Sequence, residues 1–207
     1  NPHLITTKRS IMKRRYLTAL LLLVFTLTAY SQSKFAITYS VAFPTGETSE
    51  LFPSTSWRGV DVDYSKLLND NFGVGFSTGW RVFSDNLGYL TETAGTESVS
   101  GFRYNYLNSF PVFATGTYFF DTSGNFEPYA SLGVGLVYNR LEQDVGLFTS
   151  KNTAWQFGLR PELGMDYQIG YQGVGIRAAL RYQYVASGGD VPSLPFFSFN
   201  VGVVWKN

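Results

Sequence analysis

The segment TAWQFGLRPELGMDYQI, residues 153–169, alternates apolar side chains with small or polar ones. From Trp155 to Ile169 every odd-numbered residue is apolar, and every even-numbered residue is Gly, Gln, Arg, Glu or Asp. A period of two is typical of a β-strand, because successive side chains of a strand point to opposite faces. The segment therefore predicts a long strand with one apolar face and one polar face.

The same alternation recurs along the rest of the chain, and no segment after residue 34 has a convincing helical period. Eight strands are predicted, at 34–43, 57–67, 72–83, 104–120, 129–140, 153–169, 174–184 and 196–206. In 104–120, apolar residues occupy both parities, so the facing of this fourth strand stays open.

The predicted connections alternate in length. Those after even-numbered strands are short and contain turn residues, as in Asn69-Asp70-Asn71 and Ser123-Gly124-Asn125. Those after odd-numbered strands are long and polar: 44–56, 84–103, 141–152 and 185–195. Short and long connections in turn are typical of an up-and-down antiparallel sheet, which gives an all-β fold.

Glycines and charges share one face of the predicted strands. Without the fourth strand, the apolar positions hold only two charged residues, Arg58 and Arg140, both at strand ends beside long loops. The opposite positions hold ten glycines and only two large aliphatic side chains, Val137 and Val204. An eight-stranded barrel has an interior just wide enough to be filled by side chains, and the bulky apolar face would overfill it. We therefore expect the small, polar face to line the interior and the apolar face to contact lipid, in an eight-stranded transmembrane β-barrel.

Aromatic residues lie mostly near the two ends of the predicted apolar bands. Near the long loops are Phe43, Trp57, Trp80, Tyr138, Trp155, Tyr182, Tyr184 and Phe197. Near the short turns are Phe35, Tyr64, Phe72, Phe120, Tyr167 and Trp205. Two such girdles at the headgroup levels are expected of a membrane-spanning barrel.

Four motifs carry a resemblance to a known family. They are YSVAFPTG at 39–46, SFPV at 109–112 leading to YFF at 118–120, PYASLGVG at 128–135, and the closing VGVVW at 201–205. With these motifs the chain resembles the small eight-stranded outer-membrane β-barrel proteins of Gram-negative bacteria, of the opacity and attachment type. The resemblance implies an outer-membrane location, and as partners outer-membrane lipid with lipopolysaccharide and the outer-membrane assembly machinery. Such barrels end on an aromatic residue, whereas here Trp205 is followed by Lys206 and Asn207.

The N-terminal segment has the order of a secretory signal. Lys13-Arg14-Arg15 precedes an apolar run from Leu17 to Leu27, and the small residues around Ala29 and Ser31 follow. The run is shorter than the roughly 20 residues of a spanning helix. We expect residues 1–31 to be a signal peptide with an upstream extension before Met12, removed to leave a barrel domain at 32–207.

Composition excludes several classes of function. Only 15% of residues are charged and 17% are aromatic, which excludes a disordered chain. Without residues 1–31 the chain has 11 basic and 15 acidic residues, which argues against nucleic-acid binding. There is no Cys, and the one His, His3, lies in the expected signal, so thiol, histidine-base and histidine–metal chemistry are excluded from the barrel. We predict no catalytic residue, no cofactor site and no metal site.

Charged residues on the polar face are interpreted as a salt-bridge network that fills the lumen rather than as acid–base catalysts. They are Asp61, Asp63, Glu162 and Asp166 with Arg81, Arg160, Arg177 and Arg181. A second acidic group lies in the long loops: Glu47, Glu50, Asp85, Glu92, Glu97, Glu142, Asp144 and Asp190. These are interpreted as solvated loop residues, with binding of divalent cations or of a basic partner as the alternative.

The expected function is therefore a structural or surface-interaction role of a monomeric, non-enzymatic barrel, acting through its loops on a partner that the sequence does not identify. Three alternatives stay open at this point. The first is passage of small hydrophobic molecules across the outer membrane, the second an enzyme that uses carboxylates alone, and the third a secreted soluble ligand-binding barrel.

Overall fold

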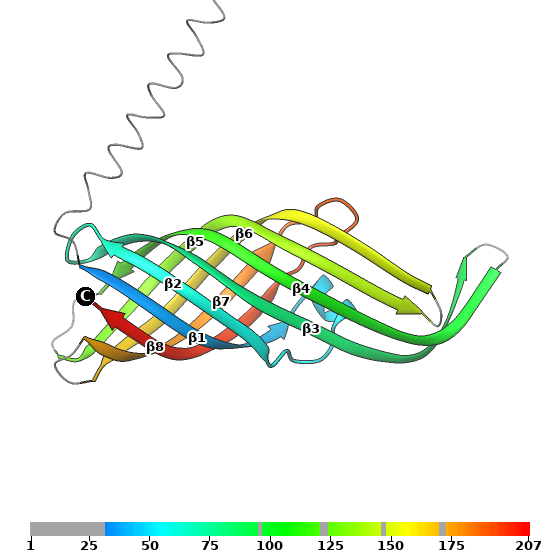
Figure 1. The fold of residues 1–207 in the computed structure, drawn as a ribbon, viewed down its shortest axis with the longest axis horizontal. Coiled ribbons are helices and arrows are strands. Elements are labelled where there is room, and N and C mark those ends of the chain that lie inside the picture. Colours follow the sequence, from blue (N-terminus) through cyan, green and yellow to red (C-terminus); the bar gives the residue numbers. More distant parts are fainter. Residues whose placement is uncertain (1–31, 95–96, 121–123, 146–147, 170–172) are drawn as a thin grey trace, which may run out of the picture. The chain divides into compact units, whose positions relative to one another are not determined.

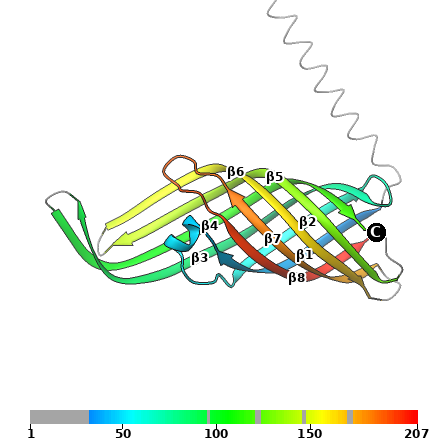
Figure 2. The same ribbon diagram turned by 180° about the vertical axis from the view of Figure 1, so that it is seen from behind.

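The strands form one closed antiparallel barrel in the order β1 to β8, as Figure 1 and Figure 2 show. The structure is a computed structural model that describes residues 32–207 except 95–96, 121–123, 146–147 and 170–172. The strands are β1 (Ser33–Pro44), β2 (Arg58–Leu67), β3 (Phe72–Ala94), β4 (Glu97–Phe119), β5 (Phe126–Val145), β6 (Phe148–Gln168), β7 (Val174–Val185) and β8 (Phe196–Lys206). The predicted fold class and strand number are confirmed. The expected signal segment, 1–31, lies outside the described residues.

Pairing between the first and last strands closes the barrel. β1 and β8 are antiparallel neighbours from Lys34↔Lys206 to Pro44↔Phe196. At the other β1 edge, β2 pairs from Ser33↔Lys66 to Tyr39↔Val60. The short β2–β3 turn uses side-chain chemistry, because the Asn69 carboxamide oxygen accepts hydrogen bonds from the backbone N–H groups of Asn71 and Phe72.

Large apolar side chains cover the outside of the barrel and polar ones lie inside. Outward residues of β6 such as Phe157 and Leu163 are exposed, whereas Gln156, Arg160 and Asp166 of the same strand are buried. The predicted assignment of inside and outside is confirmed for the seven strands on which it rested.

Register settles the facing of the fourth strand, β4. Its odd-numbered residues point inward, so Leu107, Phe113 and Phe119 are buried in the lumen, whereas Val112 and Tyr118 lie exposed on the outside. Periodicity alone could not decide this, because both faces of β4 are apolar. The lumen consequently holds more apolar volume than the other seven strands predict.

Aromatic rings on the outside form rows at two levels. At the loop end, neighbouring rings of β3, β4, β5 and β6 follow one another, with centroid separations of 6.3 Å for Trp80–Phe110, 6.4 Å for Phe110–Tyr138 and 5.2 Å for Tyr138–Trp155. At the turn end, such pairs are Phe35–Trp205, Tyr64–Phe76 and Phe126–Tyr167. These rows are the girdles that the sequence predicts.

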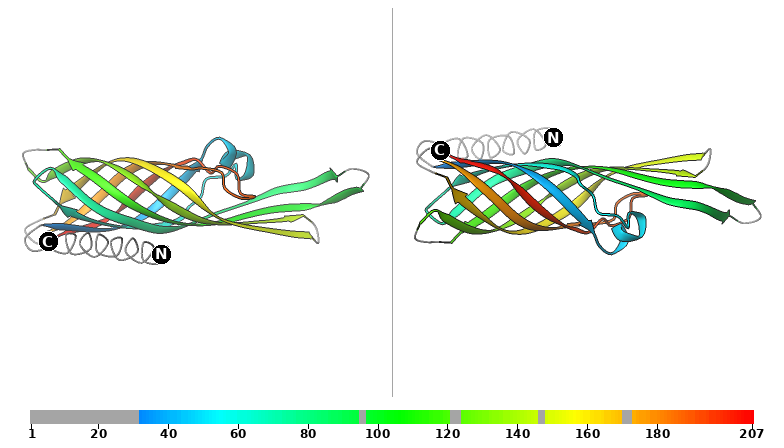
Figure 3. Two further views of the ribbon diagram at one scale, coloured as in Figure 1. Left: turned by 90° about the horizontal axis from the view of Figure 1, so that it is seen from above. Right: turned by 90° about the horizontal axis from the view of Figure 1, so that it is seen from below.

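Four strands are longer than predicted, because much of the expected loops 84–103 and 141–152 is paired sheet. β3 and β4 are 23 residues each, β5 is 20 and β6 is 21. Beyond the level of Trp80 they continue as a four-stranded sheet, which extends from the barrel in all views of Figure 3. We call residues 84–94, 97–106, 142–145 and 148–151 the loop-end sheet. Both of its faces lie beyond the apolar band, so its sequence lacks the alternation that marks the barrel strands.

Two connections fold over the barrel mouth. The first contains a short helix, α2 (Glu47–Leu51), that the sequence did not predict, followed by the buried Phe52. The second, between β7 and β8, contributes Val191 and Leu194. These side chains pack with Phe83, Leu107, Phe113, Val137 and Phe196 in one apolar cluster, the mouth cluster. The polar loops predicted at 44–56 and 185–195 therefore also close the lumen.

The strand ladder is interrupted at two prolines. Between β6 and β7, the pairs Leu159↔Tyr184 and Glu162↔Arg181 are formed and those between them, at Pro161, are missing. Between β3 and β4 the missing pairs lie at Pro111. Proline has no backbone N–H to donate to a ladder, which accounts for both places.

Within the described ranges, no helix is both long and apolar enough to cross a membrane.

Candidate functional site

A layer of ion pairs crosses the middle of the lumen, and Arg181 of β7 lies at its centre. Its Nη1 is 3.1 Å from Asp61 Oδ2 and its Nη2 donates to Asp63 Oδ2 at 2.5 Å. Its Nε donates to the Glu162 carboxylate on the neighbouring strand β6. One guanidinium therefore joins carboxylates of β2 and β6, which face each other across the lumen.

Two further arginines have close carboxylate partners. Arg177 Nε and Nη2 bind the two Asp166 oxygens at 2.7 and 2.9 Å, a bidentate pair. Arg81 Nη2 donates to Asp61 Oδ2 at 3.0 Å and also to the Ser40 hydroxyl. The interior salt-bridge network predicted from strand parity is present, with all eight predicted residues in or beside it.

The network continues toward the turn end through residues that the prediction did not include. Lys34 Nζ lies 2.8 Å from Glu127 Oε2 and 3.1 Å from Asp166 Oδ2. Lys206 Nζ donates to Glu127 Oε1 at 2.6 Å. Lys34 is the first residue of a predicted strand, and Glu127 lies in an expected turn. Lys34 has the same parity as the inward-facing Ala36, and Glu127 the same as the inward-facing Tyr129, so strand parity could have identified both residues.

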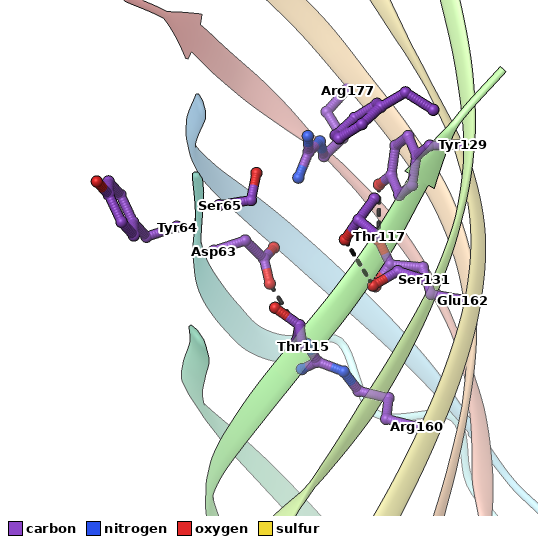
Figure 4. Close-up of a pocket in the computed structure, with 11 residues that line it drawn as sticks. Asp63, Tyr64, Ser65, Thr115, Thr117, Tyr129, Ser131, Arg160, Glu162 and Arg177 are labelled. Atoms are coloured by element: carbon purple, nitrogen blue, oxygen red, sulfur yellow. Dashed lines mark hydrogen bonds and ion pairs between the residues drawn. The ribbon is translucent and has the colours of Figure 1, made fainter. Parts of the chain in front are cut away.

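A polar cavity lies beside this layer, between β2, β4, β5, β6 and β7, and Figure 4 shows its lining. Its volume is about 20 Å³. Hydroxyls of Ser65, Thr115, Thr117 and Ser131 line it together with Arg160 and Arg177. The Tyr129 hydroxyl donates to Glu162 Oε1 at 2.6 Å at its rim.

Arg160 is the least well paired arginine of the lumen. Among the described residues, its one close carboxylate contact joins Nη2 to Asp63 Oδ1 at 3.4 Å, although its side chain is only 3% exposed. Its Nε and Nη1 have no hydrogen-bond partner within the described part of the chain. The guanidinium carbon lies 4.8 Å from the centroid of the Phe113 ring.

Two loop acids predicted as solvated are at least partly exposed and also accept hydrogen bonds between connections at the barrel mouth. Glu47 Oε2 accepts a hydrogen bond from the Ser193 backbone N–H at 3.0 Å, and Asp85 Oδ2 accepts one from Ser54 at 2.8 Å. Glu142 pairs with Arg140 at 2.5 Å. Glu92 and Glu97 have no described side chain. Among the described residues no group of three or more His, Cys, Asp or Glu is placed to hold a metal ion.

The loop-end sheet presents aromatic side chains on its outer face. Tyr89 and Phe102 pair edge to face at 5.7 Å, and both are exposed, as are Tyr104 and Tyr106 of β4. In the described part of the chain, β3 beyond Val82 and β6 before Gly158 are each paired with a strand on one side only. The sheet therefore has a free edge on β3 and on β6 within the described residues.

Comparison with known proteins gives one family. A family model described as outer membrane protein beta-barrel domain matches residues 17–206. A search of curated proteins found no match.

Several solved structures share the fold. The crystal structure of Neisserial surface protein A (NspA) has a TM-score of 0.54 at 16% identity, covering 84% of this chain and 96% of that chain. OprG from Pseudomonas aeruginosa has a TM-score of 0.55 at 14% identity, covering 86% and 96%. Ail of Yersinia pestis, solved with the heparin analogue sucrose octasulfate, has a TM-score of 0.51 at 14% identity, covering 86% and 100%. At these identities the likeness shows the fold, and it agrees with the family that the sequence motifs resemble.

Proposed function

Because the chain belongs to the outer membrane protein beta-barrel domain family, we propose that it is a non-enzymatic surface protein that acts through its loop-end sheet. The protein is an outer-membrane protein, and a secreted soluble barrel is therefore wrong. In outer-membrane barrels the short turns face the periplasm and the longer connections face outward. The loop-end sheet then lies on the outside of the cell.

The observation that carries this proposal is the length of β3, β4, β5 and β6 beyond the aromatic row. β3 continues from Trp80 to Ala94, which at about 3.3 Å per residue is roughly 45 Å of strand. A barrel that only had to span the bilayer would end near that row. None of the described apolar side chains of this sheet is buried, so we infer that the sheet is kept for contact with a partner.

A catalytic role is not supported by the side chains of the barrel. Residues 32–207 contain neither His nor Cys. The carboxylates of the lumen that could serve as acid and base, Asp61, Asp63, Glu162 and Asp166, are all held by arginines. Passage of small hydrophobic molecules stays an alternative, but the described cavity is lined by charged and hydroxyl groups, which do not favour such a solute.

Adherence of bacteria that display the protein tests the proposal. In one variant an Asn-Gly turn replaces residues 86–104, joining Asp85 to its paired residue Asn105. In a matched variant, Tyr89→Ser with Phe102→Ser, the sheet remains and only its exposed ring pair is removed. Both are expressed in a non-adherent Gram-negative host, and folded barrel in the outer membrane is measured by heat-modifiable migration in gels.

We expect the parent protein to increase self-association of cells or their retention on immobilised proteins and polysaccharides. The shortened variant should lose that gain at equal amounts of folded barrel. Partial loss in the double serine variant would locate the contact at the ring pair. Equal adherence of the parent and the shortened variant would contradict a surface role of the sheet.

A further inference from the structure

The cavity beside the charged layer has the features of a binding site for a small anion. Arg160 lines it with two N–H-bearing nitrogens, Nε and Nη1, that have no hydrogen-bond partner among residues 32–207 as far as the structure describes them. A buried donor without an acceptor destabilises the fold, and more so when the group is charged. The structure therefore calls for a further acceptor at Arg160.

No carboxylate of the network is left to fill that place. Asp63, the neighbour of Arg160, lies closer to Arg181, at 2.5 Å against 3.4 Å. Glu162 is held by Arg181 and by the Tyr129 hydroxyl. The remaining carboxylates, Asp61, Asp166 and Glu127, are taken by Arg81, Arg177, Lys34 and Lys206.

The six basic side chains of this network also exceed the five acidic ones. The bases are Lys34, Arg81, Arg160, Arg177, Arg181 and Lys206, and the acids are Asp61, Asp63, Glu127, Glu162 and Asp166. Lys206 is partly exposed at the turn end and is solvated there. Arg160 is buried, so its weak pairing cannot be relieved by bulk water.

The cavity also offers a neutral donor that would complete such a site, the Thr115 hydroxyl. Figure 4 shows Arg160 on one side of the space and Arg177 on the other, with hydroxyl side chains between them. Its volume of about 20 Å³ admits a compact ion and excludes a large organic one. A water molecule would accept hydrogen bonds from Arg160, but it would leave the guanidinium charge uncompensated in a low-dielectric lumen.

We propose that a compact monovalent inorganic anion of the chloride class binds in this cavity, held by the Arg160 guanidinium and the Thr115 hydroxyl. Asp63 and Glu162 also line the cavity, but their charges are already opposed by Arg181, so the local field at Arg160 remains favourable to an anion. The bound ion completes the ion-pair layer and stabilises the folded barrel.

The test compares chloride with gluconate, which is too large for the cavity, at matched ionic strength. Protein refolded into uncharged lipid nanodiscs is unfolded in denaturant over a series of chloride concentrations, for the parent, Arg160→Met and the control Arg140→Met. Arg140 lies on the outside and is half exposed. Above the dissociation constant, each tenfold increase in chloride should raise the folded-to-unfolded ratio of the parent about tenfold.

We expect the Arg140→Met protein to keep this dependence and the Arg160→Met protein to lose it. A parent protein whose folding ignores the choice of anion would overturn the proposal and leave the cavity to water. The same holds if the Arg160→Met protein responds as the parent does.

Should Arg160→Met not fold, crystals of the parent grown in bromide decide the question. An anomalous bromide peak within hydrogen-bond distance of the Arg160 guanidinium is expected, and its absence at that place would overturn the proposal.

Discussion

Arg181 and Arg140 carry the same guanidinium group, but Arg181 is buried in the lumen and Arg140 lies exposed on the outside of the barrel. Arg181 is 2% exposed and contacts three carboxylates, whereas Arg140 is 48% exposed and pairs with Glu142 alone. Removing one partner of a buried pair leaves an uncompensated charge, whereas an exposed pair is largely screened by water.

We therefore expect Arg181→Met to lower the free energy of unfolding by about 3–5 kcal/mol and Arg140→Met by about 0–1 kcal/mol. Urea titrations of both variants in lipid vesicles measure the two changes. Similar losses in the two variants would mean that the lumen is open to water at the level of Arg181.

Outward-facing residues also differ in what surrounds them along the length of the barrel: lipid between the two aromatic rows, and water in the loop-end sheet. Leu132 of β5 and Tyr104 of β4 are equally exposed, at 50% and 48%, but Leu132 lies between the two aromatic rows and Tyr104 lies in the loop-end sheet. We expect Leu132→Arg to destabilise the barrel by about 2–4 kcal/mol, the cost of a cation at the bilayer midplane. Tyr104→Arg should change stability by less than about 0.5 kcal/mol, as surface substitutions do.

Equilibrium unfolding in vesicles of a defined thickness separates these two outcomes. A penalty for Tyr104→Arg as large as that for Leu132→Arg would place the loop-end sheet within the bilayer and contradict its assignment to the outside.

Strand parity predicted the charged lumen residues because apolar and polar side chains alternate clearly on both sides of each of them along the strand. Arg160 and Glu162 lie within the most regular strand, and their inward facing follows from Phe157 and Leu163 facing outward. The weak pairing of Arg160 could not be predicted from the sequence. It depends on which arginine lies closest to Asp63, and that distance is set by the register of strands that are far apart in the sequence.

At the scale of elements, the sequence predicts strands well only where two solvents differ. Within the bilayer level, lipid outside and a polar lumen inside impose a period of two. In the loop-end sheet neither face is lipid, so residues 84–103 read as a polar loop although β3 and β4 pair there. The helix α2 is five residues long and is held by contacts such as Asn105 Nδ2 to Leu51 O, which no local signal encodes.

Pro161 interrupts the β6–β7 ladder in the middle of the barrel wall, and its replacement is a test of that interruption. We expect Pro161→Val to supply the missing N–H and stabilise the barrel by about 1 kcal/mol. Backbone amides around Tyr182 should exchange more slowly with deuterium. The control is Pro128→Val near the turn end, where β5 pairs with β6 at Met165 without interruption.

Faster exchange around Tyr182 in the Pro161→Val protein would show that the proline is needed to fit β6 to β7. In that case the interruption would be a requirement of the wall rather than a local loss.

At the scale of the whole molecule, the lumen is filled at successive levels. The mouth cluster with Phe52 and Leu194 closes the loop end, the ion-pair layer crosses the middle, and Phe119 with Tyr129 packs near the turn end. We therefore expect the refolded protein to carry no steady ion current in planar bilayers, in contrast to barrels of about sixteen strands.

A sixteen-stranded porin reconstituted in the same way is the positive control for this recording. Steady single-channel currents of porin size from the eight-stranded protein would contradict the filled lumen and favour the passage alternative.

The inward charges of β6 also bear on the fidelity of assembly. A strand that closes one residue out of register turns all its side chains to the opposite face, so Arg160, Glu162 and Asp166 would enter hydrocarbon while Leu163 entered the lumen. Arg160 alone would then cost about 2–4 kcal/mol, and its mispaired partners would add to this. The inward charges thus disfavour misregistered insertion, because only the correct register closes the barrel without placing a charge in the hydrocarbon.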